Sequence, residues 1–279
     1  MTFHLYSNGK KVTAQVPLAE FKEEAAGVFE SLRTYRGKIF RLEEHLDRLF
    51  ESAKTSGFSL FSFDRKRIRR EINLGLKAFQ KEQPSSAEKD LFLRLTMAQN
   101  RIFVMIGARA HGAQLYKSGA ALKTSPVKRS LSNASPPEVK TSSYQNAVLA
   151  SLEPSGPETY EWLFLDQNGF VTEVRIGNFF IVKYVGAGLK PAPTLFTPPT
   201  LGILNGVTRR FVIKCALALK LEVREIPLTR HEIFNADEAF LTNTSWEILP
   251  VRELDARKIG GKIPGPVTAK LMKKFKERL

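Results

Sequence analysis

Cysteine and histidine are both scarce in this sequence. Cys215 is the only cysteine in 279 residues, and the four histidines are spread over positions 4, 45, 111 and 231. A single thiol excludes an internal disulfide and any zinc site built on cysteines, and it agrees with a reducing compartment. Because no metal-ligand spacing joins the histidines, the sequence predicts no metal site.

Long apolar runs are also missing. No run approaches the roughly 20 residues that a membrane helix needs, and the first residues, MTFHLYSNGKKV, lack the apolar stretch of a secretion signal. With 43% hydrophobic and 25% charged residues, the composition is typical of a globular protein with one large or two modest domains. We therefore expect a cytoplasmic protein without a membrane partner.

Acidic residues are few beside basic ones, 28 against 43, which gives a formal net charge of +15. Clustered Lys and Arg neutralise phosphates, so this charge raises the hypothesis of a nucleic-acid-binding protein. Residues 64–79 and 269–279 are the two basic clusters, and in both the apolar residues follow helical spacing. Neither interleaves aromatic residues as a base-stacking surface requires. Solvated helix faces are the favoured interpretation, and we do not expect a nucleic-acid partner.

The residues up to 117 alternate strand and helix patterns. The predicted elements are hairpins turning on Asn8-Gly9 and Arg36-Gly37, a helix over residues 41–57, and strands over residues 90–97 and 101–109. The composition then shifts to Ser, Pro, Ala, Lys and Gly without a sustained period. We predict a smaller N-terminal α+β domain over 1–117 and an interdomain linker over 118–130.

Residues 131–279 are predicted to form a larger domain. Its expected elements are a helix over Tyr144–Ala150, a hairpin on Asn168-Gly169, a strand over 178–185, a helix after the turn 204–206, and a strand-turn-strand over 238–251. The fold class is therefore α/β (α+β) with two domains.

Several short stretches carry side chains suited to chemistry. The turn GILNGVTRR opens a helix whose free amides, with the hydroxyl of Thr208, suit a phosphate, but any helix start that contains glycine has the same features. Glu173 lies in the alternating run FVTEV, so we expect its carboxylate to point inward, where it needs a cationic or hydrogen-bonding partner. A protonated heterocyclic nitrogen is such a partner.

Five separated motifs occur in a particular order along the chain. They are VFESLRTYRGKIFRLEEHLDRLFESAKTSGF, Lys140 with Tyr144, VTEVRIGNFFIV, LFTPPTLGILNGVTR and AFLTNTSWEILPV. In this order, over residues 5 to 255, the sequence resembles the class IV aminotransferases, which include branched-chain and D-amino-acid aminotransferases and aminodeoxychorismate lyase. The resemblance implies a fold-type IV enzyme that binds pyridoxal 5'-phosphate in the cleft between a smaller N-terminal and a larger C-terminal domain. It also implies a homodimer in which the partner's N-terminal domain completes each site.

The resemblance implies a role for each matching position. Lys140 matches the lysine that forms the Schiff base with the cofactor and then moves the proton, and an amine suits both duties. Glu173 matches the acid at the pyridine nitrogen, where a carboxylate deepens the electron sink. The remaining matches are Arg41 for the phosphate, Val207 and Thr208 for the helix start at the same phosphate, Tyr144 for the ring hydroxyl, and Thr244 with Ser245 for phosphate and substrate carboxylate. Apart from the resemblance, Arg41 also suits an ordinary surface salt bridge.

The residues that determine substrate choice in the family differ, in this chain, from the patterns of its subgroups. Arg94 stands near a substrate-contacting arginine of branched-chain enzymes, but Phe92 and Leu95 replace the usual tyrosine and proline. Arg94 therefore has two interpretations, a substrate contact or a strand residue facing solvent. Asn205 and Asn243 replace a proline and a small residue, and we expect both changes to preserve the backbone donors.

The leading hypothesis is an aminotransferase acting between an L-amino acid, with branched-chain substrates as one option, and a 2-oxo acid. The alternative enzyme is aminodeoxychorismate lyase, which releases 4-aminobenzoate and pyruvate. The short spacing from Lys140 to Tyr144 suits it, but no arginine-rich loop follows residues 91–97. A basic nucleic-acid-binding protein on a degenerate enzyme fold is the third hypothesis, and it depends on charge alone.

Overall fold

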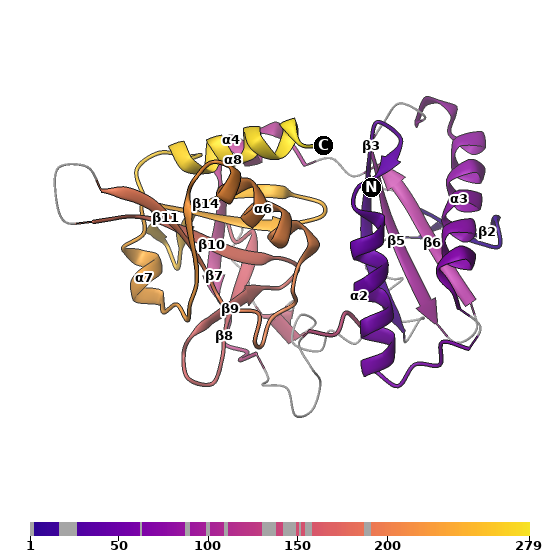
Figure 1. The fold of residues 1–279 in the computed structure, drawn as a ribbon, viewed down its shortest axis with the longest axis horizontal. Coiled ribbons are helices and arrows are strands. Elements are labelled where there is room, and N and C mark those ends of the chain that lie inside the picture. Colours follow the sequence, from indigo (N-terminus) through magenta and orange to yellow (C-terminus); the bar gives the residue numbers. More distant parts are fainter. Residues whose placement is uncertain are drawn as a thin grey trace. The chain divides into compact units, whose positions relative to one another are not determined.

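Two compact units make up the described part of the chain (Figure 1). The computed structural model describes residues 3–16, 27–61, 63–86, 90–98, 101–108, 111–129, 138–141, 149–150, 152–153, 158–186 and 191–279, with the backbone alone at 13–16. The first unit takes the residues described within Met1–Ala110 and Val139–Tyr144, and the second takes those within His111–Glu138 and Gln145–Leu279. The chain therefore returns to the first unit for the segment that contains Lys140.

The first unit is built on a six-stranded antiparallel sheet with the order β2-β1-β6-β5-β3-β4. Its strands are β1 (Phe3–Ser7), β2 (Lys10–Val16), β3 (Val28–Tyr35), β4 (Lys38–Ile39), β5 (Leu91–Ala98) and β6 (Arg101–Ala108). Asn8-Gly9 and Arg36-Gly37 all have positive φ, as two-residue hairpin turns require. Both hairpin predictions are confirmed.

Two amphipathic helices, α2 (Leu42–Thr55) and α3 (Arg65–Glu82), pack on this sheet, and the short 3-10 helix η1 spans Pro84–Ser86. Their buried apolar side chains join the sheet in one core. Burial of each large aliphatic side chain contributes about 1.5–3 kcal/mol to stability. The apolar stripes that predicted the helices are therefore also the faces that hold them on the sheet. Gly75 lets α3 approach the sheet closely, because a Cβ there would lie 3.4 Å from Val104.

The basic face of α3 is partly ion-paired with α2. Arg65 contacts both Glu43 and Asp47, and Arg69 contacts Glu43 at 2.6 Å. These groups are exposed, so each pair adds at most about 1 kcal/mol. The exposed positions of these residues agree with the solvated helix face predicted for residues 64–79, and the ion pairs with α2 are an addition from the structure.

The second unit is built on a nine-stranded mixed sheet with the path β12-β11-β10-β13-β14-β7-β8-β9, and β15 pairs with β14 beside it. The strands are β7 (Ala120–Thr124), β8 (Glu161–Leu165), β9 (Val171–Val174), β10 (Asn178–Val185), β11 (Ala192–Thr197), β12 (Glu222–Glu225), β13 (Glu238–Asn243), β14 (Glu247–Leu254) and β15 (Arg257–Lys258). The helices are α4 (Ala113–Ser118), α6 (Val207–Ala218), α7 (Arg230–Phe234) and α8 (Pro266–Glu277). No helix in the described residues is long and apolar enough to cross a membrane.

The unit boundaries differ from the predicted domains. Strand β7 lies inside residues 118–130, the predicted linker, and pairs in parallel with β14 and β8. Its buried residues are mostly alanine, so they gave no strand pattern, and only pairing with distant strands makes this segment part of a sheet. Residues 139–141, predicted for the larger domain, lie in the first unit.

Most other predicted elements of the second unit are present. Gly169 has φ 85° in the turn between β8 and β9. Helix α6 follows the turn 204–206 as predicted and buries Phe211, Val212 and Cys215. Strands β13 and β14 flank the polar turn. The predicted helix over Tyr144–Ala150 lies largely outside the described residues.

Candidate functional site

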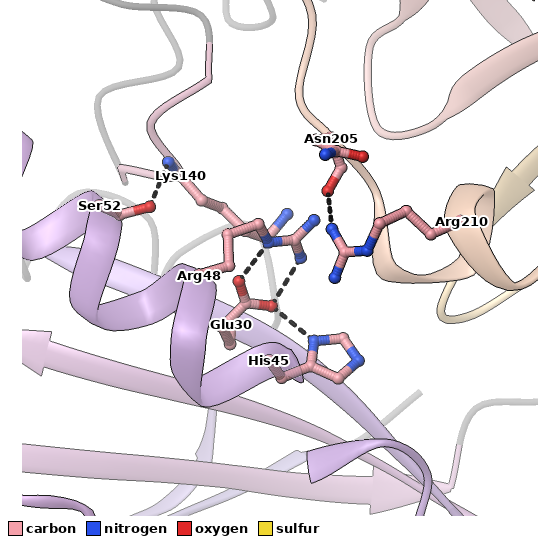
Figure 2. Close-up of polar contacts among 7 residues, drawn as sticks. All are labelled: Glu30, His45, Arg48, Ser52, Lys140, Asn205 and Arg210. Carbon is pink, nitrogen blue, oxygen red and sulfur yellow. Dashed lines mark hydrogen bonds and ion pairs between the residues drawn. The ribbon is translucent and has the colours of Figure 1, made fainter. Parts of the chain in front are cut away.

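The main chain of Lys140 is fixed within the first unit. Its amide donates to the Oγ of Ser52 on α2 at 3.1 Å, as Figure 2 shows. Its carbonyl accepts from the amide of Phe29 on β3 at 3.0 Å, and Thr141 bridges to Val28. The segment is therefore held by both a strand and a helix, which restricts where the lysine side chain can reach.

The side chains of Lys140 and Arg94 meet at one aromatic ring. Lys140 Nζ lies 4.7 Å and the Arg94 guanidinium carbon 3.7 Å from the centre of the Phe29 ring. Aromatic faces attract cations, so this ring stabilises both groups. Arg94 is only 5% exposed, so the interpretation of a solvent-facing arginine is wrong.

A buried charged cluster lies between β3 and α2 (Figure 2). Glu30 contacts Arg48 Nε at 2.7 Å, Arg48 Nη2 at 2.8 Å and His45 Nδ1 at 2.8 Å. Burial opposes ionisation of Glu30, but the Arg48 charge and the hydrogen bonds from His45 and Arg48 outweigh it and hold its pKa well below the usual value. For His45, burial lowers the pKa against the opposing contact with Glu30, and the charges of Arg48 and Lys140 act in the same direction as burial.

Sequence reasoning missed this cluster. Its signal was a glutamate at a buried position of a strand, together with His45 and Arg48 three residues apart on the buried stripe of α2. Charged residues on an apolar stripe need partners, because an unpaired buried charge is costly. The cluster ties α2 to β3, the two elements that hold Lys140.

Arg41 stands directly before α2 with φ 48°, in the left-handed region. Such a conformation costs a non-glycine residue about 1–3 kcal/mol and persists where surrounding contacts enforce it. Its Nε donates to Glu44 at 2.6 Å, so this arginine makes the salt bridge that the sequence offered as its alternative role. The side chain remains 25% exposed.

Glu173 lies on β9 and is 3% exposed. One carboxylate oxygen forms an ion pair with Arg129 Nη2 at 2.6 Å. The other accepts from Asn178 Nδ2 and from the Leu204 amide, both at 3.3 Å. The predicted inward-pointing acid is present, and the cation beside it is an arginine that sequence reasoning missed because it lies in the predicted linker.

Asn178 connects Glu173 to the start of α6. Its Nδ2 also donates to the Leu204 carbonyl at 2.8 Å. A Cβ on Gly206 would lie 2.2 Å from Asn178 Oδ1, so only glycine fits at this helix cap. The structure thus brings together the acid and the helix start, which the sequence predicted as separate features.

Helix α6 begins at Val207 and Thr208, both buried, and within the described residues no side chain caps its first turn. The first amides of a helix have no intrahelical acceptor and attract anions. Arg210 of the same helix donates to the Asn205 carbonyl at 2.9 Å, as Figure 2 also shows. The start of α6 therefore has the chemical features of an anion-binding helix N-terminus.

Thr244 and Ser245 lie in the turn between β13 and β14, where Asn243 has an unexpected effect. Its Oδ1 accepts from the amides of Ser245 at 2.8 Å and Trp246 at 2.6 Å. The expectation that Asn243 preserves the backbone donors is therefore wrong for these two amides. Asparagine side chains commonly accept from amides two residues ahead, and this turn does so.

The predicted residues fall into two groups. Lys140, Arg94 and Arg41 lie in the first unit. The second unit contains Glu173, Val207, Thr208, Thr244 and Ser245. Tyr144 lies outside the described residues. A cavity of about 1010 Å³ in the second unit is lined by none of these residues; its lining includes Lys123, Lys128, Arg230 and Arg257.

Comparison with known proteins identifies the class that this fold and residue set define. Residues 27–254 match the family model described as amino-transferase class IV. The chain therefore belongs to the class IV aminotransferase family. This confirms the family predicted from the motifs, and with it an enzyme, a transaminase, of the two-domain α/β fold.

Three relatives, one compared by sequence and two by structure, illustrate the similarity. A branched-chain-amino-acid aminotransferase of Pseudomonas aeruginosa is 33% identical over 267 residues, covering 89% of this chain and 82% of that protein. A T.th. branched-chain amino acid aminotransferase, solved with pyridoxamine 5'-phosphate, superposes with a TM-score of 0.76 at 26% identity, covering 99% and 94% of the two chains. The Thermoproteus uzoniensis enzyme, solved with norvaline, gives a TM-score of 0.75 at 27% identity, with the same coverage. These relatives favour the aminotransferase over the lyase.

Proposed function

We propose that this aminotransferase uses pyridoxal 5'-phosphate to move an amino group between a branched-chain L-amino acid and a 2-oxo acid. The observation that carries the proposal is the link from buried Glu173 through Asn178 to the start of α6, whose first turn no described side chain caps. The relatives support both parts of the proposal, since one compared structure contains pyridoxamine 5'-phosphate and the relatives are named branched-chain aminotransferases.

The residues fit this cofactor. Glu173 is a buried carboxylate held by Arg129 and by two donors at 3.3 Å, and a buried acid of this kind suits a protonated ring nitrogen. A phosphate suits the free amides at the start of α6, because the helix dipole favours negative charge there. Gly206 keeps the backbone bare at the same place.

When bound, the cofactor supplies the electron sink for removal of the substrate α-proton. Glu173 stabilises positive charge at the ring nitrogen, and Arg129 fixes the orientation of its carboxylate. Lys140 Nζ holds the cofactor and moves the proton. The other proposed roles are phosphate binding by Arg41, Val207, Thr208 and Thr244, ring-hydroxyl contact by Tyr144, and substrate-carboxylate binding by Arg94 and Ser245.

Borohydride reduction followed by peptide mass spectrometry tests the central role. We expect the cofactor mass on the peptide containing Lys140, its loss in Lys140→Ala, and its retention in Lys54→Ala, a control lysine on α2. Leucine, isoleucine and valine should convert the visible spectrum of the loaded enzyme to the pyridoxamine form. A cofactor attached elsewhere would refute the assignment, and pyruvate release from aminodeoxychorismate would favour the lyase.

We also propose a homodimer in the cytoplasm. The family resemblance supports the dimer, and the single cysteine agrees with a reducing compartment. Light scattering should give a mass near twice the chain mass of 31.4 kDa. A monomeric active enzyme would contradict this part of the proposal.

A further inference from the structure

The cavity of about 1010 Å³ in the second unit has no role in the proposed transamination. Its volume is at the upper end of the range for small-molecule sites, roughly 300–1,000 Å³. Lys128 lines the cavity, whereas its neighbour Arg129 pairs with Glu173 at 2.6 Å. One segment of the chain therefore supplies different side chains to the cavity and to the candidate cofactor site.

Four lysine and arginine side chains line this cavity, and three of them have no acidic partner in the described part of the chain. Lys123 comes from β7, Lys128 from the segment after it, and Arg257 from β15. The exposed arginines of α3, in contrast, are paired with acids of α2. Uncompensated cations gathered in a concave site raise the local concentration of anions.

Two acids also line the cavity, and one of them is already paired. Asp255 accepts from the amide and the hydroxyl of Thr124 at 2.7 Å and 2.6 Å. The fourth cation, Arg230, lies 3.6 Å from the same carboxylate. Glu153 is the other acid, and no cation among the described residues pairs with it. Three unpaired cations therefore stand against one unpaired acid, and the lining has an excess of positive charge.

The turn between β14 and β15 holds Arg257 in this lining. Asp255 and Ala256 have φ values of 51° and 60°, the left-handed conformation of a two-residue hairpin turn. Alanine keeps this conformation only where surrounding contacts enforce it. The two bonds from Thr124 to Asp255 fix the turn against β7. Arg257 is thereby kept beside the cations of that strand and of the segment after it.

Two aromatic rings position cations at the cavity. Lys123 Nζ lies 5.5 Å from the centre of the Trp162 ring, and the Arg257 guanidinium carbon lies 4.6 Å from the centre of the Phe234 ring. An aromatic face attracts a cation without removing its charge, and both rings line the cavity themselves. These two cations are therefore held in place while their charges stay available to an anion.

We propose that this cavity binds a small phosphate compound with at least two negative charges, at a site separate from the residues proposed for the cofactor. The unpaired cations come from three segments, and a phosphate group has three terminal oxygens that accept from different directions. A carboxylate presents only two oxygens in one plane, so it matches this lining less well. Lysine and arginine are also the side chains that recognise phosphate. The inference does not depend on the proposed function.

Calorimetric titration of the cofactor-loaded enzyme with inorganic diphosphate tests this site, because the bound cofactor fills its own phosphate position. We expect saturable binding that weakens with added KCl, since salt screens exposed charges. Lys128→Ala and Arg257→Ala should each lower the affinity about 10-fold, because a hydrogen bond to a charged group is lost. Lys258→Ala is the matched control, since Lys258 is the other residue of β15 and does not line the cavity. It should change the affinity about twofold or less.

Lysine acetylation followed by peptide mass spectrometry gives a second measurement that needs no substitution. Lys123, Lys128 and Lys258 are all exposed, so all three should react. Diphosphate should slow the modification of Lys123 and Lys128 and leave that of Lys258 unchanged. Citrate, an anion with carboxylates in place of phosphates, should bind more weakly than diphosphate.

Four results would overturn the inference. They are the absence of saturable diphosphate binding, an equal loss of affinity in Lys258→Ala, no protection of Lys123 and Lys128 from acetylation, and tighter binding of citrate. None of these results bears on amino transfer, which the conversion of the cofactor spectrum by leucine measures separately.

Discussion

Each unit of the molecule contains a buried glutamate paired with an arginine, and two such acids, Glu30 and Glu173, differ in the distances and charges of the partners described here. Glu30 is completely buried and makes three contacts of 2.7–2.8 Å with Arg48 and His45. Glu173 makes one contact of 2.6 Å with Arg129 and two of 3.3 Å with neutral amides.

The difference separates a structural acid from a candidate functional one. A carboxylate whose acceptor positions are filled by close, charged partners has little capacity for a ligand. Longer bonds to neutral amides hold a carboxylate less tightly than short bonds to cations do. Burial and an arginine partner therefore do not by themselves identify a functional acid.

Replacing the structural acid should have the largest effect on stability. Glu30→Gln leaves Arg48 charged and buried without its counter-ion, which costs about 3–5 kcal/mol. Urea unfolding measures this loss. The control is Glu43→Gln, which removes an exposed acid paired with Arg65 and Arg69 and should cost less than about 1 kcal/mol. Equal losses in the two variants would contradict the comparison.

Replacing Glu173, the candidate functional acid, should mainly affect catalysis. Glu173→Gln removes negative charge from the ring nitrogen, and we expect the rate of amino transfer to fall about 10²-fold. Stopped-flow spectroscopy of the half-reaction with leucine measures it. Glu161→Gln is the control, because Glu161 is similarly buried in the same unit and pairs with Arg175 at 3.0 Å. A loss of rate as large in the control would remove the distinction.

Lowering the pH should reduce the stability contributed by the buried charged cluster of Glu30, His45 and Arg48 in two stages. Both pKa values are lowered by folding, His45 from 6.5 and Glu30 from 4.5, so the unfolded chain binds protons first. Stability is therefore present above these values and is lost as pH falls, by up to about 1.4 kcal/mol per pH unit for each proton. Urea midpoints between pH 7 and 3 measure the slope.

Two substitutions test which residue causes each stage of the loss of stability. His45→Gln should flatten the slope between pH 6.5 and 4.5, the ordinary values of the two groups. Glu30→Gln should flatten it below 4.5. A slope unchanged in both variants would show that other groups control the acid response.

The smallest effect is expected at Ser52 on α2, whose hydroxyl contacts the main chain of Lys140. Ser52→Ala removes the acceptor of the Lys140 amide, and a neutral hydrogen bond contributes about 0.5–1.5 kcal/mol. We expect a several-fold lower rate of amino transfer, with the fold retained. Ser56→Ala at the end of the same helix, whose hydroxyl donates to the Ser52 carbonyl at 2.7 Å, is the control. Identical rates in the two variants would mean that Ser52 does not position the lysine.

Much of the local structure could be predicted from short-range patterns. The hairpin turns on Asn8-Gly9 and Arg36-Gly37 follow from residues that accept positive φ. Helices α2 and α3 follow from their apolar stripes. Strand β7 did not follow, because its small residues become a strand only between β14 and β8.

The site was predictable only in part. Motif order predicted Lys140 and Glu173, but no local signal joined Glu173 to Arg129 or Ser245 to His111, since these contacts connect residues far apart in the chain. The effect of Asn243 on the turn amides was also missed, because it depends on the side-chain rotamer within that turn.

The sequence by itself determined the family, the hairpin turns and the amphipathic helices, because these depend on residue type and spacing along the chain. Only the tertiary structure decided which partners surround each buried acid, which turn amides are already bonded, and which unit holds Lys140. Those outcomes depend on distances between segments that no one-dimensional pattern contains.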